Sequence, residues 1–231
     1  MFDPKLVKAI TLDLDDTLWP VWPVIERAEK VLQAWLSQRA PGAAALFADT
    51  KARHDIRERV SHAHPELKYN LSAMRLEAIR QALLRCEEDP YLAEPAFDVF
   101  FAERNRVTLF DDAIPGLEFL ASRFPLVAVS NGNADIERIG LGRFFQSSIS
   151  AQKFGVGKPD PRIFQAAAQS VGIDTVHVLH VGDDGALDVL GALDCGMQTV
   201  WVNREDHLWP HAAMPHETVA TLTELCDFFR A

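Results

Sequence analysis

The stretch VKAITLDLDDTLW, residues 7–19, carries the strongest structural signal in the chain. Its first part is rich in aliphatic and β-branched residues, which predicts a buried strand over residues 7–14. Three carboxylates, Asp13, Asp15 and Asp16, lie at its end. Like charges this close repel one another and resist ionising together. A metal ion, a lysine or the water around a loop must therefore offset their charge.

The composition limits the classes of function that fit. About half of the 231 residues are apolar, enough for one large core or for one core with a smaller attached domain. The 33 acidic residues outnumber the 23 basic ones, giving a formal charge of −10. An acidic chain without polybasic segments is a poor candidate for binding nucleic acid or an anionic membrane surface. We therefore expect neither partner, and any phosphorylated substrate must be attracted by a local cation.

Targeting signals and cysteine usage point to the cytoplasm. No apolar run approaches the roughly 20 residues of a membrane span, and the first ten residues, MFDPKLVKAI, lack a signal pattern. The three cysteines, Cys86, Cys195 and Cys226, are scattered and have no metal-ligand spacing. Such usage is typical of a reduced compartment.

From residue 126 onward, short apolar runs alternate with helical periodicity. Strands are predicted over 126–130, 147–151, 176–181 and 199–202, with a short edge strand over 217–219. Helices are predicted over 115–123, 161–171, 186–195 and 222–230. Nearly continuous hydrophobic strands are typical of parallel sheets that are covered on both faces. The alternation therefore predicts an α/β fold with a doubly wound parallel sheet.

Residues 20–110 interrupt this alternation and contain no convincing strand. Amphipathic helical stretches are predicted there over 24–39, 43–61, 71–86 and 95–106. We therefore expect a core domain made of residues 1–19 and 111–231, and an all-helical domain over 20–110 inserted after the first strand.

Polar residues follow each predicted strand of the core. They are Asp13 to Thr17 after the first strand, Ser130-Asn131-Gly132 after the second, Lys158 after the third, and Asp183 and Asp184 with Asp188 after the fourth. Ligands of open α/β sheets bind beyond the carboxyl ends of the strands. We therefore expect these side chains to converge on one edge of the sheet.

In this order, the motifs DxDxT, Ser-Asn-Gly, Lys-Pro and GDDxxxxD resemble the four motifs of the haloacid dehalogenase (HAD) superfamily. The resemblance implies a Rossmann-like core and a helical cap of the first type, which closes over the site. The segments 129–133, 140–144 and 180–184 are also similar to a bacterial subgroup of small phosphatases, some acting on flavin mononucleotide or on the phosphorylated precursor of riboflavin.

The resemblance also implies catalytic roles. Asp13 matches the nucleophile that forms an aspartyl-phosphate, and Asp15 matches the general acid and base. Lys158 supplies a positive charge beside them, with Lys153 as an alternative for this role. We interpret Asp16 as a loop residue without a catalytic role.

The implied cofactor is Mg²⁺, a cation that prefers oxygen ligands. The resemblance assigns to it the Asp13 carboxylate, the backbone carbonyl of Asp15 and Asp183. Asp184 is a further candidate ligand, whereas Asp188 is expected to orient Lys158 or water rather than to bind the ion.

Other residues are predicted to contact the substrate. Ser130 and the backbone N–H of Asn131 are expected to hold the phosphoryl oxygens. Thr17 is grouped with them at the phosphate site, where its hydroxyl is expected to close the first loop. Trp19 lies at the entry to the helical domain, where it could line the substrate pocket or fix the hinge. Candidates for contacts with the leaving group are Arg75, Arg104 and Asn105. The two histidines of the fourth strand region, His177 and His180, are expected to be structural.

Three functions remain open at this point. The first is a Mg²⁺-dependent phosphatase of a small phosphorylated metabolite, acting as a monomer or homodimer. The second is a 2-haloacid dehalogenase, which needs neither a metal nor the second aspartate, so that Asp15, Asp183 and Asp184 argue against it. The third is a non-catalytic HAD-like binding protein, which loss of Asp13 or Asp15 would indicate; both are present.

Overall fold

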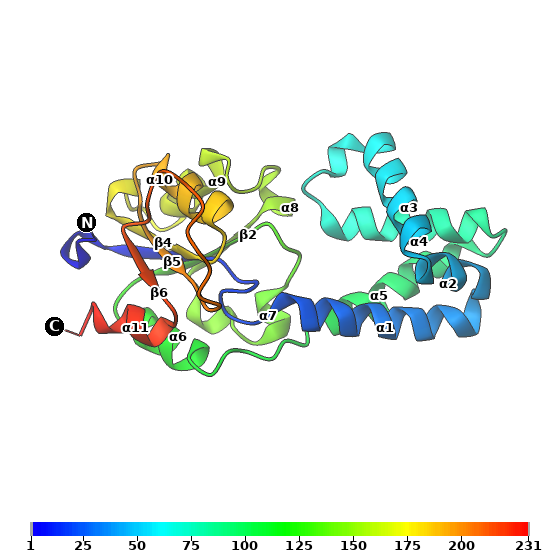
Figure 1. Ribbon diagram of the computed structural model, residues 1–231, viewed down its shortest axis with the longest axis horizontal. Coiled ribbons are helices and arrows are strands. Elements are labelled where there is room, and N and C mark those ends of the chain that lie inside the picture. The colour runs from blue at the N-terminus through cyan, green and yellow to red at the C-terminus, as the bar shows by residue number, and fades with distance from the viewer. Residues whose placement is uncertain (1, 231) are drawn as a thin grey trace. The chain divides into compact units, whose positions relative to one another are not determined.

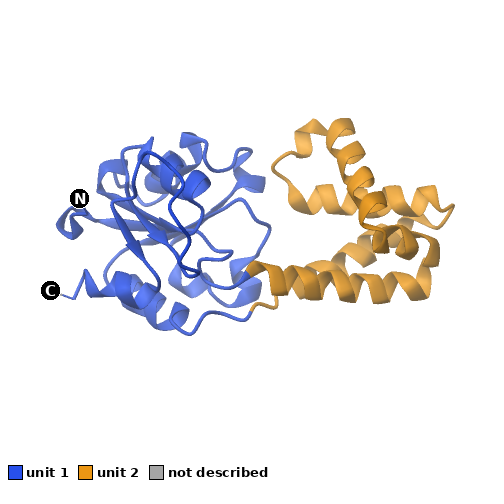
Figure 2. Ribbon diagram, in the orientation of Figure 1, with its two compact units in different colours: residues 1–20, 108–231 blue, residues 21–107 orange. Residues whose placement is uncertain are grey.

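The structure is a computed structural model that describes residues 2–230. The chain divides into unit 1, formed by residues 1–20 and 108–231, and unit 2, formed by residues 21–107 (Figure 2). The predicted boundaries, 19/20 and 110/111, differ from this division by one and three residues. Residues 108–110 belong with unit 1 because Phe110 N–H donates a hydrogen bond to the carbonyl of Leu18 at 3.0 Å. Within the described range, no helix is both long and apolar enough to cross a membrane.

Unit 1 is built on a six-stranded sheet whose paired strands all run parallel (Figure 1). The strands are β1 (Ala9–Leu12), β2 (Leu126–Ser130), β3 (Ser147–Ser150), β4 (Val178–Gly182), β5 (Gln198–Val202) and β6 (Glu217–Val219), in the order β3-β2-β1-β4-β5-β6. The fold class predicted from the sequence is thus confirmed. The order reverses beside β1, which places the carboxyl ends of β1, β2 and β4 next to one another, where open sheets bind ligands.

Helices cover both faces of the sheet. They are α6 (Ala113–Ala121), α7 (Ile136–Ile139), α8 (Ala151–Phe154), α9 (Pro161–Ser170), α10 (Gly191–Leu193) and α11 (Leu222–Asp227). On one face α9 packs Ile163, Phe164 and Ala167 against Val127 and Val129 of β2. α6 and α11 pack together on the other face (Figure 1). Because both faces are covered, every residue of β1, β2, β4 and β5 is buried.

The predicted helix over 186–195 is wrong in detail. A π-helical turn, Gly185–Leu190, precedes the short α10. The carbonyl of Asp184 accepts hydrogen bonds from the N–H groups of both Asp188 (2.9 Å) and Val189 (3.2 Å), which widens this turn. Such π-helical turns are rare and occur frequently at functional sites.

Unit 2 contains helices in all the predicted regions. They are α1 (Val21–Arg39), α2 (Pro41–Ala48), α3 (Thr50–Ala63), α4 (Leu71–Arg85) and α5 (Ala93–Arg104). Their apolar faces share one core, which includes Leu32, Ile79 and Phe100. The prediction of a single helix over 43–61 is wrong, because α2 ends and α3 begins on either side of Asp49. The carboxylate of Asp49 accepts hydrogen bonds from the N–H groups of Lys51 and Ala52 and so caps a new helix, α3.

Candidate active site

The central contact of the site is an ion pair of Lys158 with two aspartates. The ammonium of Lys158 contacts Oδ1 of Asp13, which directly follows β1, and lies 2.5 Å from Oδ1 of Asp188. The three side chains are 3%, 10% and 2% exposed, respectively. Burial disfavours the charge of Lys158, but the two carboxylates outweigh it and raise its pKa above the ordinary value. Lys153, the alternative for this role, is exposed.

A buried histidine holds Asp188 from the other side. Nε2 of His180 lies 3.0 Å from Oδ1 of Asp188, and its Nδ1 lies 2.7 Å from the hydroxyl of Thr11. Burial lowers the pKa of His180 below its ordinary value, so the ring is neutral at pH 7. The proton must then lie on Nε2, facing the carboxylate, and Nδ1 accepts from Thr11. Burial opposes ionisation of Asp188, yet Lys158 and His180 together lower its pKa to about 2.

Three acids form a cluster suited to a cation. Among the described residues, Asp13, Asp183 and Asp188 each offer an oxygen atom, and these atoms lie within 4.8 Å of one another. Burial, with the nearby Asp188 and Asp16, raises the pKa of Asp183 to about 7. Burial also raises the pKa of Asp13 well above its ordinary value, against the effect of Lys158. The negative charge at this position is therefore only partly compensated.

Charge and ligand chemistry both fit a divalent metal ion here. With Lys158 protonated and the three aspartates ionised, the four side chains carry a formal charge of −2, which a divalent cation cancels. Carboxylate oxygens are the ligands that Mg²⁺ prefers. Asp188 already accepts from Lys158, from His180 and from the N–H of Asp184 at 3.0 Å. Asp13 and Asp183 are therefore the carboxylates best able to hold the ion.

Asp184 lies outside this cluster. Its carboxylate oxygen Oδ1 accepts hydrogen bonds at 2.8 Å from the N–H groups of both Ala186 and Leu187. The side chain thus caps the π-helical turn. Of the residues predicted as metal ligands, Asp13 and Asp183 are brought together, while the arrangement gives Asp184 a capping role.

The loop after β2 fixes the backbone of the lysine. Oδ1 of Asn131 accepts from the N–H of Lys158 (2.7 Å), and its Nδ2 donates to the Lys158 carbonyl (2.8 Å). The side chain of Asn131 is thereby committed to the backbone of Lys158, and the contact of its backbone N–H with a phosphoryl oxygen stays a prediction. The buried hydroxyl of Ser130 accepts from the N–H of Gly132 at 2.9 Å and retains its own proton to donate.

The loop after β1 is held by its own side chains. The indole N–H of Trp19 donates to Oδ1 of Asp15 at 2.9 Å, and the hydroxyl of Thr17 donates to Oδ1 of Asp183 at 3.1 Å. Asp16 has a left-handed backbone, with φ of 57°, and its N–H donates to the carbonyl of Trp19. Trp19 is completely buried. In this arrangement it orients the carboxylate of Asp15 rather than exposing a surface for a substrate.

The other residues predicted to contact the leaving group lie in unit 2. Arg104 is 1% exposed and Asn105 is 7% exposed. The amide of Asn105 donates to the carbonyl of Phe101 at 2.8 Å. The guanidinium of Arg75 pairs with Glu29 at 2.8 Å and lies 3.7 Å from the centroid of the Phe100 ring. Their roles toward a substrate stay predictions.

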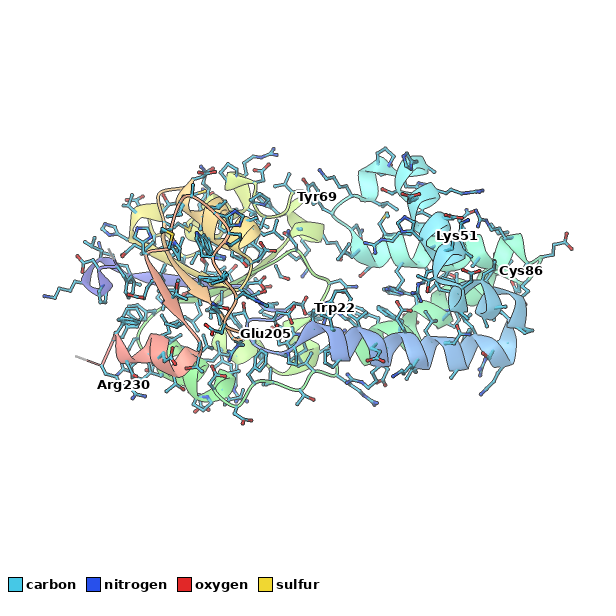
Figure 3. The ribbon with its side chains drawn as sticks, viewed as in Figure 1. Trp22, Lys51, Tyr69, Cys86, Glu205 and Arg230 are labelled. Atoms are coloured by element: carbon cyan, nitrogen blue, oxygen red, sulfur yellow. The ribbon has the colours of Figure 1, made fainter. Side chains whose placement is uncertain are left out.

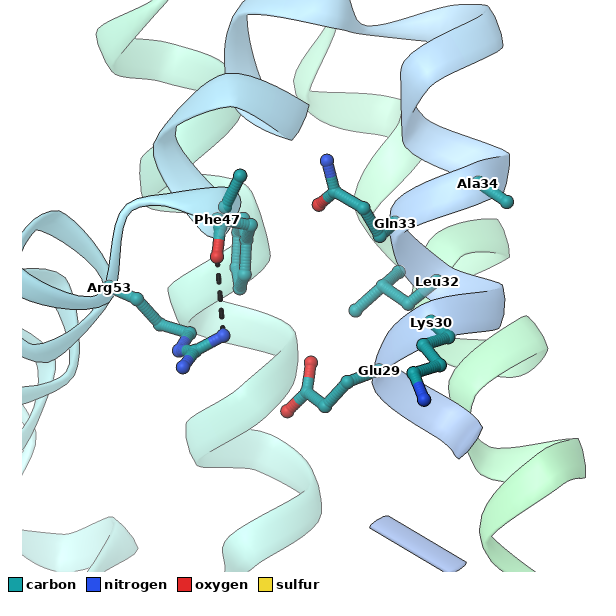
Figure 4. A pocket seen from close by; sticks show the side chains of 8 residues that line it. Glu29, Lys30, Leu32, Gln33, Ala34, Phe47 and Arg53 are labelled. Carbon is teal, nitrogen blue, oxygen red and sulfur yellow. Dashed lines mark hydrogen bonds between the residues drawn. The ribbon is translucent and has the colours of Figure 1, made fainter. Parts of the chain in front are cut away.

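Unit 2 contains a cavity that no pattern in the sequence predicts. It has a volume of about 360 Å³ and is lined by α1 and by residues near the junction of α2 and α3. The guanidinium of Arg53 and the carboxylate of Glu29 project into the same space (Figure 4). Arg53 also donates to the carbonyl of Phe47 at 3.2 Å. Trp22, at the start of α1, is 76% exposed, whereas Trp19 is completely buried (Figure 3).

Comparison with known proteins identifies the family of this chain. A family model described as haloacid dehalogenase-like hydrolase matches residues 7–196. The chain is 33% identical, over 95% of its length and 94% of the relative's, to 5-amino-6-(5-phospho-D-ribitylamino)uracil phosphatase YigB of Escherichia coli. It is 31% identical to a phosphoserine phosphatase of Thermus thermophilus, over 95% and 98% of the two chains.

A solved structure is similar as well. It is described as a 2-haloacid dehalogenase of Pseudomonas syringae pv. Tomato DC3000, with 34% identity, a TM-score of 0.92, and coverage of 96% of this chain and 98% of the other. The match of the family model over most of the chain, together with these relatives, decides the assignment. The chain belongs to the haloacid dehalogenase-like hydrolase family.

Proposed function

We propose that this hydrolase is a Mg²⁺-dependent phosphatase that cleaves a small phosphomonoester through an aspartyl-phosphate intermediate. The observation that carries the proposal is a buried cluster in which Lys158 pairs with both Asp13 and Asp188, and Asp183 completes a group of three acids. A carboxylate nucleophile, a fixed cation and a divalent-metal site are the elements that phosphoryl transfer requires.

Asp13 and Asp183, with the backbone carbonyl of Asp15, would hold the metal ion. When bound, Mg²⁺ would neutralise charge on the phosphoryl oxygens and hold the phosphate in line with the nucleophile. Lys158 contributes a second positive charge in direct contact with Asp13. The hydroxyl of Ser130 and the N–H of Asn131 would donate to the remaining phosphoryl oxygens.

The reaction proceeds in two displacements. In the first, a carboxylate oxygen of Asp13 forms a bond to phosphorus while the bond to the leaving oxygen breaks, and Asp15 gives that oxygen a proton. In the second, the Asp15 carboxylate takes a proton from water, which attacks phosphorus and breaks the bond to Asp13. Inorganic phosphate leaves, and both aspartates return to their starting states. The hydrogen bond from Trp19 to Asp15 at 2.9 Å keeps this carboxylate in one orientation between the two steps.

The proposed substrate is a small phosphorylated metabolite such as flavin mononucleotide or a phosphate of the riboflavin pathway. The name of the E. coli relative, a phosphatase of 5-amino-6-(5-phospho-D-ribitylamino)uracil, supports this choice. The name of the Thermus relative supports phosphoserine as a second compound to test.

Dehalogenation is the second candidate, because the similar Pseudomonas structure is described as a 2-haloacid dehalogenase. Both reactions begin with attack by an aspartate. Asp15 favours phosphate chemistry, since a carbon–halogen bond breaks without proton transfer to the leaving group. The acid cluster that includes Asp183 favours it as well, because dehalogenation needs no metal ion.

Hydrolysis of p-nitrophenyl phosphate with Mg²⁺ and with excess EDTA tests the mechanism. We expect activity that chelation abolishes, that Mg²⁺ restores, and that Asp13→Asn and Asp15→Asn each lower by at least about 100-fold. A panel of the uracil phosphate named above, flavin mononucleotide, phosphoserine and 2-chloropropionate then identifies the substrate class. Activity of Asp13→Asn equal to that of the wild type contradicts the mechanism, and turnover of 2-chloropropionate alone establishes the dehalogenase instead. Lys158→Met should also lose most of the activity, whereas the matched control Lys153→Met should keep it, because Lys158 is buried beside Asp13 and Lys153 is exposed.

A further inference from the structure

One charged side chain at the edge of the site is not explained by the mechanism above. Arg204 lies two residues beyond β5, and its side chain is only 13% exposed. Its Nε and Nη2 both donate to the backbone carbonyl of Thr17, at 3.2 and 2.9 Å. Its Nη1 and Nη2 each donate to a carboxylate oxygen of Asp112 at 3.0 Å. The guanidinium also lies 3.9 Å from the centroid of the Phe110 ring.

Thr17 connects this arginine to the metal-binding cluster. Its side chain is completely buried, and its hydroxyl donates to Oδ1 of Asp183 at 3.1 Å. Asp183 is also held at its backbone, because the indole N–H of Trp201 donates to the Asp183 carbonyl at 2.6 Å. Trp201 and Arg204 are three residues apart. These hydrogen bonds, together with the chain segment 201–204, form a closed ring of Thr17, Asp183, Trp201 and Arg204.

The geometry of this ring restricts the rotation of one peptide group. Two N–H donors from a planar guanidinium fix the direction of the Thr17 carbonyl more tightly than a single donor does. The peptide plane that follows Thr17 then cannot rotate without breaking both bonds. The hydroxyl that donates to Asp183 belongs to the same residue, so a fixed peptide plane holds the backbone of Thr17 where its hydroxyl reaches Asp183.

We propose that Arg204 is a positioning residue, which acts through Thr17 to hold Asp183 in the orientation that binds the metal ion. This inference rests on the proposed function for its Mg²⁺ site. Residues that orient metal ligands typically change metal affinity or activity by roughly 10- to 100-fold when they are mutated. Arg204→Met removes both bonds to Thr17 and leaves every metal-binding carboxylate in place.

The test is a calorimetric titration of the metal-free protein with Mg²⁺, together with kinetics on p-nitrophenyl phosphate over a range of Mg²⁺ concentrations. We expect Arg204→Met to weaken Mg²⁺ binding by roughly 10- to 100-fold. The Mg²⁺ concentration for half-maximal activity should rise by the same factor. Arg204→Lys keeps the charge but not the paired donors, and should recover part of the affinity.

A double-mutant cycle separates this role from simple stabilisation. Thr17→Val removes the hydrogen bond from the hydroxyl to Asp183. The double variant with Arg204→Met should lose little more Mg²⁺ affinity than either single variant, because both changes act on this one hydrogen bond. Arg230→Met is the matched control. Arg230 also pairs with an aspartate, Asp227 at 2.9 Å, but on an exposed surface, and its removal should leave Mg²⁺ affinity unchanged.

Asp112→Asn tests the competing explanation, in which Arg204 only anchors Asp112 and the start of α11. Oδ2 of Asp112 accepts from the N–H of Leu222 at 2.6 Å, so this variant should lower the unfolding midpoint in EDTA. It should weaken Mg²⁺ binding by less than about threefold, because the bonds from Arg204 to Thr17 remain.

Two results overturn the proposal. One is a Mg²⁺ affinity of Arg204→Met equal to that of the wild type; the absence of detectable Mg²⁺ binding in both proteins counts as the same result. The other is a loss in Asp112→Asn as large as in Arg204→Met. If the wild type hydrolyses no phosphomonoester, the proposed function fails, and the Mg²⁺ titrations still decide the role of Arg204.

Discussion

Asp183→Asn should make the metal-free protein more stable while removing its response to Mg²⁺. In the folded protein, burial raises the pKa of Asp183 to about 7, against an ordinary value of 3.8. The folded state therefore holds this proton more tightly than the unfolded state does between these two values. Stability falls as the pH rises through this window, and the loss is complete above pH 7. Asparagine has nearly the same shape and carries no charge, so it avoids the loss.

The expected size of the gain follows from the shift. A difference of about 3 pKa units, at about 1.4 kcal/mol each, corresponds to about 4 kcal/mol at pH 8. Partial exposure to solvent reduces this upper limit, and we expect a gain of about 2 to 4 kcal/mol. At pH 4, close to the ordinary pKa, the gain should be less than about 1 kcal/mol. The hydrogen bond from Thr17 is retained, because an asparagine oxygen also accepts.

Urea unfolding in EDTA at pH 4, 6 and 8 measures this difference, with saturating Mg²⁺ as a second condition. A ligand at 100 times its Kd should stabilise the wild type by about 2.7 kcal/mol, and the variant should gain much less. Asp184→Asn is the matched control. Asparagine is as good a helix cap as aspartate, so the change should be within about 0.5 kcal/mol at each pH. Equal stability of the wild type and Asp183→Asn at pH 8, or a gain independent of pH, would refute the reasoning.

Three further predictions concern the same site. The affinity for Mg²⁺ should rise at least about tenfold per pH unit between pH 5 and 7, because binding displaces the proton of Asp183, whose pKa is about 7, and burial also raises the pKa of Asp13, the other carboxylate ligand; calorimetry in buffers of different ionisation enthalpy measures the released protons, and an affinity that does not change with pH contradicts this linkage. Gly182→Ala should cost about 1 to 3 kcal/mol in urea unfolding and most of the activity, because its Cβ would lie 2.3 Å from Cγ of Asp188, and a fully active variant argues against a fixed position for that acid. Asn131→Ala should lower kcat at least tenfold with little change in Mg²⁺ affinity, since it removes both hydrogen bonds to the backbone of Lys158; loss of Mg²⁺ binding with unchanged kcat would be the opposite result.

The sequence alone determined the fold class and the side of the sheet on which the site lies. Runs such as residues 126–130 are apolar up to the final Ser130, which is typical of a parallel sheet that is covered on both faces. In such a sheet the carboxyl ends of the strands share one edge. Residues at strand ends, such as Asp13, Ser130 and Asp183, are thereby brought together whatever the details of packing.

The sequence was less informative where local signals compete. Residues 43–61 have one helical periodicity, but the structure breaks it at Asp49, because an aspartate that caps a helix also ends the preceding one. The turn after Gly182 was predicted as an ordinary helix, and the carbonyl of Asp184 instead accepts hydrogen bonds from two successive N–H groups.

Only the tertiary structure decided how the polar side chains are paired. Lys158 and Asp13 are 145 residues apart, and Arg204 and Thr17 are 187 apart. The sequence contains no periodicity that links such positions. A buried charged or polar group must find a partner to offset its desolvation, and that partner is whichever group the packed elements bring within about 3 Å. Residue types and strand ends can therefore be deduced from the sequence, whereas the partners of each buried polar atom depend on the three-dimensional packing.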